Sequence, residues 1–186
     1  MDLNKYFDMQ RILDEHILNE HPELKEQDNL PWKLLALQVE LGECANEWRG
    51  FKKWSNNQEP RTKALKFPAM MEEDKEYYNP LLEEYVDGFH FVLSIGLELK
   101  ILPPYEITPY ISKNTTDHFN NVFEDISNLK KSINEDWEVE EIVELYDELF
   151  RGYIGLGDML GFTWNQIGQA YIAKNEINHE RQVNGY

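Results

Sequence analysis

Apolar residues recur every three or four positions over most of the chain, and no stretch of useful length alternates as a half-buried strand does. This spacing predicts helices. Their ends are marked by proline at first helical positions, by capping sequences such as Thr163-Trp164-Asn165-Gln166, and by Pro103-Pro104 or Gly161 after last turns. The predicted helices cover residues 3–20, 31–54, 80–100, 115–133, 138–160 and 164–182.

The segment 55–79 lacks this periodicity, contains Pro60 and Pro68, and is predicted to be a flexible loop or arm. We therefore expect a single domain over residues 1–186. It should be an all-α bundle of about six helices without a sheet, built around a four-helix metal-binding core.

The balance of charge excludes several classes of partner. The chain has 35 acidic and 18 basic residues, a formal net charge of −17. This argues against binding nucleic acid or an anionic membrane, both of which require a basic surface. Cys44 is the single cysteine, so no intrachain disulfide can form. The N-terminal residues lack signal-peptide features, and no apolar run is long enough to span a membrane, so a cytoplasmic protein is expected.

The first candidate metal-ligating pair is Glu40 and Glu43, three residues apart within a predicted helix. Residues at this spacing share a helix face, so the two carboxylates point the same way. Like charges side by side on a partly buried helix are unfavourable without a cation between them. Taken alone, however, two glutamates on a solvated helix face would explain the pattern equally simply.

A second pair, Glu84 and Asp87, repeats this spacing in a helix that apolar residues nearly encircle. Glu83 is expected on a different face, whereas His90 is expected on the face of Asp87. If the two helices pack together, four carboxylates converge, and oxygen ligands of this kind suit Mg²⁺. Two ions between such acids would form the arrangement used in phosphoryl chemistry.

Basic and amide side chains gather in two other places. Lys174, Asn178 and Arg181 fall on one face of the last predicted helix, with Asn175 and Gln182 beside them, which suits a phosphate and a base. Residues 49–66 carry six cations against one acid and are a candidate polyphosphate-binding arm. A polar outer helix face and a solvated loop are the simpler alternatives.

Five sequence blocks together resemble the dimeric dUTPase family, which belongs to the all-α nucleoside triphosphate pyrophosphatases that include the MazG type. The blocks are LLALQVELGECANE at 34–47, FKKW at 51–54, LEEYVDGFHF at 82–91, YIAKNEIN at 171–178 and RQVNGY at 181–186. The resemblance covers nearly the whole chain, and residues 103–137 match least.

The resemblance implies an all-α homodimer that hydrolyses dUTP, and also dUDP, to dUMP. It implies two or three Mg²⁺ ions per site, held by Glu40, Glu43, Glu84 and Asp87, with Glu40 or Glu43 assisting a water that attacks the α-phosphorus. The substrate-binding residues that it implies are Lys52, Lys174, Arg181 and Tyr186 for the phosphates, Asn178 for the nucleoside, Trp54 and His90 lining the site, and Gln10 for the uracil.

Three alternatives remain open at the level of sequence. A relative that cleaves dCTP could use the same metal site. A di-iron bundle would require two Glu-x-x-His motifs, of which Asp87-x-x-His90 imitates half of one. A non-enzymatic helical interaction protein would leave the four acids exposed. The sequence identifies no regulatory protein partner.

Overall fold

The computed structural model describes residues 2–68, 71–101 and 107–185, apart from the side chain of Glu72. In these ranges the chain forms six α-helices, and the all-α expectation is confirmed. The helices are α1 (Leu3–Glu20), α2 (Leu30–Trp48), α3 (Pro80–Glu98), α4 (Thr115–Asn134), α5 (Val139–Met159) and α6 (Trp164–Val183). None of these helices is long and apolar enough to span a membrane.

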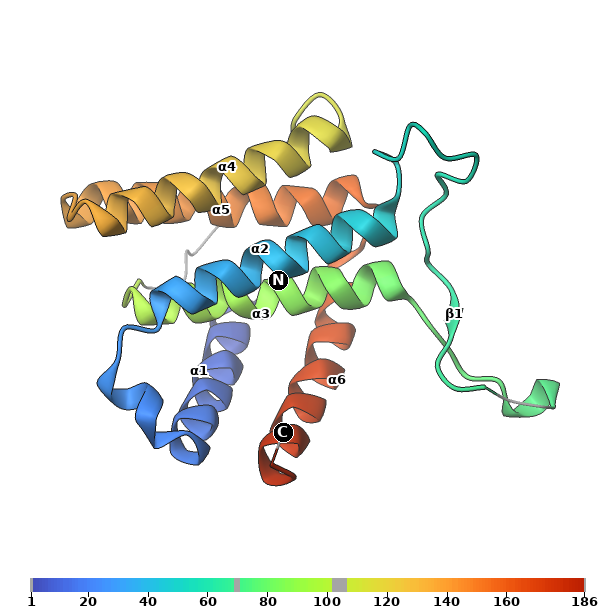
Figure 1. Cartoon of the computed structure of the whole chain (residues 1–186), viewed down its shortest axis with the longest axis horizontal. Coiled ribbons are helices and arrows are strands. Elements are labelled where there is room, and N and C mark those ends of the chain that lie inside the picture. Colours follow the sequence, from blue (N-terminus) through green and yellow to red (C-terminus); the bar gives the residue numbers. More distant parts are fainter. Residues whose placement is uncertain (1, 69–70, 102–106, 186) are drawn as a thin grey trace.

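Helix α3 is the centre of the molecule. It packs against α1, α2, α5 and α6, and α4 completes one side by packing on α5 and α2. Figure 1 shows α2 and α3 side by side, with α4 and α5 on one side of this pair and α1 and α6 on the other. Because α3 is covered from several directions, most of its apolar side chains are buried, as the near-continuous hydrophobic sequence predicted.

Two tyrosines hold α3 against α5. The Tyr85 hydroxyl donates to the carbonyl oxygen of Tyr153 at 3.2 Å, and the Tyr153 hydroxyl donates to that of Tyr85 at 2.8 Å. Their rings are stacked with centroids 5.1 Å apart. Gly88 makes this approach possible, since a Cβ there would lie 2.1 Å from the Tyr153 hydroxyl oxygen. The back of the acid-bearing helix is therefore rigidly supported.

A capping sequence correctly marked the start of one helix, whereas the end of another was predicted wrongly. Thr163 and Gln166 form the predicted capping box of α6. Helix α2, in contrast, ends at Trp48 and not at residue 54 as predicted. Arg49 adopts a left-handed conformation with φ 65°, and its N–H donates to the Ala45 carbonyl. A left-handed residue ends a helix, and here it does so without the usual glycine.

The segment between α2 and α3 contains a small hairpin, so the expectation of no sheet was wrong in this detail. Strands β1 (Ala64–Leu65) and β2 (Tyr77–Tyr78) pair antiparallel, with a 3₁₀ turn at Glu72–Asp74 between them. Figure 1 shows the hairpin extending away from the bundle. A second 3₁₀ turn, Pro22–Glu26, follows α1.

Arg61 ties the start of this arm to both neighbouring helices. Its N–H donates to the Glu47 carbonyl at 2.9 Å, and its carbonyl accepts from the Leu81 N–H at 3.1 Å. Its guanidinium also lies 2.8 Å from Glu47 Oε1. The last turn of α2 and the first turn of α3 are thus joined through one arginine.

Candidate active site

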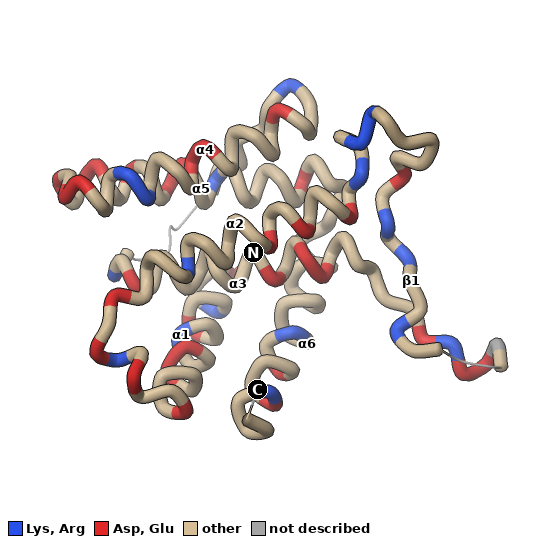
Figure 2. The backbone as a smooth tube through the Cα atoms, viewed as in Figure 1, with Lys and Arg blue, Asp and Glu red and all other residues tan. Residues whose placement is uncertain are grey.

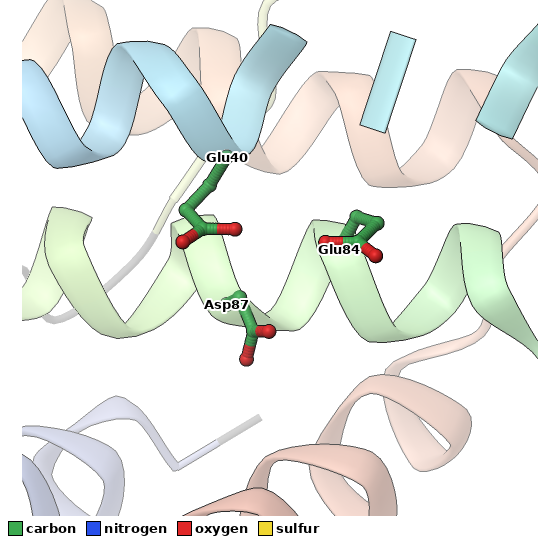
Figure 3. A group of neighbouring side chains, drawn as sticks. All are labelled: Glu40, Glu84 and Asp87. Atoms are coloured by element: carbon green, nitrogen blue, oxygen red, sulfur yellow. The ribbon is translucent and has the colours of Figure 1, made fainter. Parts of the chain in front are cut away.

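Three carboxylates from two helices meet at the centre of the α2–α3 pair. Oxygens of Glu40, from α2, and of Glu84 and Asp87, from α3, all lie within 4.8 Å of one another. Figure 3 shows Glu40 reaching across to the face of α3 that carries Glu84 and Asp87. The predicted packing of the two acidic helices is therefore present. We call these three residues the acid group.

The acid group is electrostatically strained. Burial, together with the charges of Asp87 and Glu43, raises the pKa of Glu40 to about 7. Burial and the same two charges raise the pKa of Glu84 to about 7 as well. Carboxylates this close favour a cation among them, because a positive charge removes the repulsion. Hard oxygen ligands at this separation fit a divalent ion such as Mg²⁺.

Lys174 supplies positive charge at one edge of the acid group. Its Nζ lies 2.6 Å from Asp87 Oδ2 and 3.1 Å from Glu83 Oε1. The expectation that Glu83 lies on a different face was wrong. Glu83 and Asp87 are four residues apart on α3, and this spacing places both beside the same lysine.

A pocket of about 370 Å³ adjoins the acid group and shares Glu40 and Asp87 with it. Its walls come from α1, α2, α3 and α6. The other lining residues are Gln10, Leu13, Asp14, Ile17, Trp32, His90, Phe91, Ser94, Lys174, Asn178, Arg181 and Gln182. One wall is apolar and aromatic and another is cationic, which suits a ligand that combines a base with phosphates.

The polar stripe predicted on the last helix faces this pocket. Lys174, Asn178 and Arg181 all line it, and Arg181 Nη1 donates to Asn178 Oδ1 at 3.3 Å. Gln182 also lines the pocket, and its buried Oε1 has no hydrogen-bond partner among the described residues. This placement favours a binding role over a purely outer polar face, and that role stays a prediction.

Gln10 and His90 form part of the opposite wall. Gln10 Oε1 accepts from His90 Nδ1 at 2.7 Å and from the Tyr171 hydroxyl at 2.8 Å. Burial, and secondarily the charge of Lys174, lower the pKa of His90 to about 3, so its imidazole is neutral near pH 7. Both residues line the pocket, and the predicted role of Gln10 in reading uracil stays a prediction.

Other predicted site residues lie outside this assembly. Glu43 is exposed and not in the acid group, although its charge affects Glu40 and Glu84. Asn175 is buried but is not a lining residue, while Lys52 and Trp54 lie after the end of α2. Trp54 is 78% exposed and contacts Phe51 edge-on. Tyr186 lies outside the described residues, and the roles of all five remain predictions.

Two pocket residues had no signal in the sequence. Asp14 and Ser94 line the pocket from α1 and α3, and Ser94 Oγ donates to Asp14 Oδ2 at 2.7 Å. The apolar spacing of α1 predicted the helix and the burial of Phe7 and Leu13, but it gave Asp14 no distinct role. A count of polar positions on the buried face of that helix would have pointed to Gln10 and Asp14 together.

The charges are segregated along the chain. Figure 2 shows acidic segments on neighbouring parts of α2 and α3 and a series of basic segments on the chain that leaves α2. Several of these cations are engaged within the arm: Lys63 Nζ lies 4.0 Å from the Tyr77 ring centroid, and Lys66 Nζ lies 3.6 Å from Glu76. Their predicted contact with polyphosphate stays a prediction.

Fold and site together define an all-α protein with a clustered acid group beside a partly cationic pocket. These features are typical of a nucleotide-hydrolysing enzyme. The chain belongs to the dUTPase family, whose sequence model matches residues 2–68 and 70–186. Its function is accordingly that of a dUTP pyrophosphatase. Searches of curated proteins and of solved structures gave no match.

Proposed function

We propose that the chain hydrolyses dUTP to dUMP and pyrophosphate in a Mg²⁺-dependent reaction in which the acid group holds the metal. One observation supports this most strongly: Glu40 and Asp87 belong both to the acid group and to the walls of the adjoining pocket. A ligand in that pocket would place its phosphates against the metal ligands. Glu43, close enough to shift its neighbours' pKa values, would complete the ligand set.

Bound Mg²⁺ would lower the pKa of a coordinated water and polarise the phosphoryl oxygens. The protein's own residues would accept the proton of the attacking water and bind the phosphates and the nucleoside. Glu40 or Glu43 would accept the proton of the water that attacks the α-phosphorus. Lys174 and Arg181, on the pocket wall, would bind the departing phosphates, Arg through paired N–H groups and Lys as a point charge. Asn178 would contact the nucleoside.

Initial rates with dUTP, dCTP, dTTP and UTP, each in Mg²⁺ and in EDTA, test this function. We expect hydrolysis of dUTP in Mg²⁺, loss of that activity in EDTA, and poor cleavage of the other three nucleotides. Equal rates with dUTP and dCTP would instead indicate the broader pyrophosphatase. Full activity in EDTA would overturn the metal assignment.

We further propose that the chain forms a homodimer, and an exposed apolar face on α2 supports this. Leu35 is 61% exposed and Val39 is 48% exposed, one turn apart. At Gly42, the next position on this face, an added Cβ would meet no atom within 4 Å. Apolar side chains in such a row are commonly covered by a partner.

Sedimentation velocity tests the dimer. Leu35→Glu should shift the wild-type dimer to monomer by placing a charge in the interface. Val139→Glu is the matched control, since Val139 is 69% exposed but lies at the start of α5. A wild-type protein that sediments as a monomer at micromolar concentration would rule out the proposal.

A further inference from the structure

Gln10 is the centre of a hydrogen-bond chain that joins α1 to α3 and α6. Its Nε2 donates to Asp14 Oδ1 at 2.7 Å. Its Oε1 accepts from both His90 and Tyr171, as described above. Both lone pairs of Oε1 are thus used within the protein, and the amide has only its second N–H left to offer to a ligand.

Asp14 determines which end of the Gln10 amide donates and which end accepts in this series of hydrogen bonds. An ionised carboxylate only accepts hydrogen bonds, so while Asp14 is ionised the amide nitrogen of Gln10 must face Asp14 and the oxygen must face His90. Ser94 Oγ donates to the other carboxylate oxygen, and Lys33 Nζ lies 3.9 Å from it. Burial raises the pKa of Asp14, while Lys33 and these two donors oppose the shift.

The orientation of Gln10 fixes the proton of His90. A neutral imidazole carries one N–H, and only a protonated Nδ1 can donate to Gln10 Oε1. Nε2 of His90 then carries a lone pair, while the Tyr171 backbone also interacts with the imidazole and raises its pKa against the larger effect of burial. His90 is 5% exposed and lines the pocket, and its Nε2 has no hydrogen-bond partner within the described part of the chain. Its ring is stacked on Tyr171 with centroids 4.1 Å apart, which prevents it from turning to find one.

A buried acceptor without a donor requires an explanation, because folded proteins satisfy nearly all such groups. We propose that Asp14 is a positioning residue for base selection: through Gln10 it keeps the His90 Nε2 lone pair available to a hydrogen-bond donor on the ligand. The inference rests on the proposed function. Uracil carries a proton on N3 and can donate it, whereas N3 of cytosine carries a lone pair that would face another lone pair.

The variant Asp14→Asn keeps the shape of the side chain but allows residue 14 to donate a hydrogen bond to Gln10. Its new amide group can donate to Gln10 Oε1, which lets the Gln10 amide turn and donate to His90 Nδ1. The imidazole proton then moves to Nε2. We expect ¹⁵N spectra to show His90 protonated on Nδ1 in the wild type and on Nε2 in the variant. We also expect the dUTP-to-dCTP ratio of kcat/KM to fall at least tenfold.

Glu15→Gln is the matched control, because it makes the same change from acid to amide at an exposed residue of α1 that does not line the pocket. It should keep both the wild-type tautomer and the wild-type ratio. A ratio that falls equally in both variants would show that Asp14 acts only through its charge and would overturn the inference.

The wild-type spectrum decides the question even if the variant does not fold or the protein proves inactive on dUTP. A His90 ring protonated on Nε2 near pH 7 would overturn the inference irrespective of activity. Absence of dUTP hydrolysis together with an Nδ1–H tautomer would instead refute the proposed function and leave the positioning role of Asp14 intact.

Discussion

Lys174 Nζ lies 2.6 Å from Asp87 Oδ2, which brings an ammonium group of α6 directly onto an acid of α3. The same lysine contacts Glu83. The charges of both carboxylates are therefore balanced by a lysine that is also expected to bind the substrate phosphates. A metal bound at Asp87 would weaken the attraction between Asp87 and Lys174 and would leave the lysine available to a phosphate.

This relationship predicts the effect of Lys174→Met. In EDTA the variant should lose about 2 kcal/mol of unfolding free energy, because a charged hydrogen-bonded group loses its partner. Saturating Mg²⁺ should recover much of that loss. Urea denaturation with and without the metal measures it. Lys25→Met, which removes an exposed bond to Asn19, is the control and should change stability by less than about 0.5 kcal/mol. Equal losses in the two variants would contradict the prediction.

Single replacements in the acid group test the metal ligands. Glu40→Ala or Asp87→Ala should reduce kcat more than tenfold, a barrier increase above about 1.4 kcal/mol, with the helical circular dichroism unchanged. Titration calorimetry should show weakened Mg²⁺ binding. Glu144→Ala, on the exposed side of α5, should leave both unchanged. A variant that kept more than a tenth of wild-type kcat would remove that residue from the ligand set.

Stability should depend on pH in an unusual direction in EDTA. The pKa values of Glu40 and Glu84 rise from 4.5 to about 7 on folding. Between these values the folded chain holds more protons than the unfolded chain, so each increase in pH lowers its stability. Above about pH 7 the penalty is complete.

Thermal unfolding of the wild type and of Glu40→Gln/Glu84→Gln isolates this contribution. Because glutamine imitates the protonated acid, the two Tm values should nearly coincide near pH 4 and separate as pH rises, with the variant more stable at pH 8. Mg²⁺ should reverse the order by stabilising only the wild type. A separation that does not change with pH would contradict the assigned pKa shifts.

Gly88 should tolerate no side chain. Gly88→Ala would bring a Cβ within 2.1 Å of the Tyr153 hydroxyl and should destabilise the protein by about 2 kcal/mol. Adding Tyr153→Phe removes the closest atom, but the ring carbon at 3.0 Å remains. Gly88→Ala should therefore cost less unfolding free energy in the Tyr153→Phe background than in the wild type. Additive losses in a urea denaturation cycle would show that the two residues do not interact.

The sequence predicted the helices well where a local signal marked their ends. The capping box at Thr163 and the Asn114 cap, which accepts from the Asp117 N–H, follow from sequence alone. The end of α2 was predicted six residues too late. Nothing in the residue type of Arg49 indicated that it would adopt a left-handed conformation.

The acids of the site could be predicted because their spacing along each helix places them on one face. The i, i+3 pairs placed Glu84 and Asp87 on one face, and packing of two such helices followed. The Asp14–Ser94 bond joins residues 80 positions apart on different helices, and no periodicity encodes such a pair. The hydrogen-bond chain through Gln10 is likewise a property of three helices together, and only the assembled fold reveals it.

The position of Arg61 has a consequence for how this protein can vary. Its bonds to Glu47 and Leu81 close the connection between α2 and α3 before the hairpin begins. Residues 62–68 and 71–79 therefore lie in an appendage beyond this closed connection, and lengthening, shortening or proteolytic cleavage of the appendage need not move the two helices apart. Evolution can reshape this appendage while the distance between the acids of α2 and α3 stays the same.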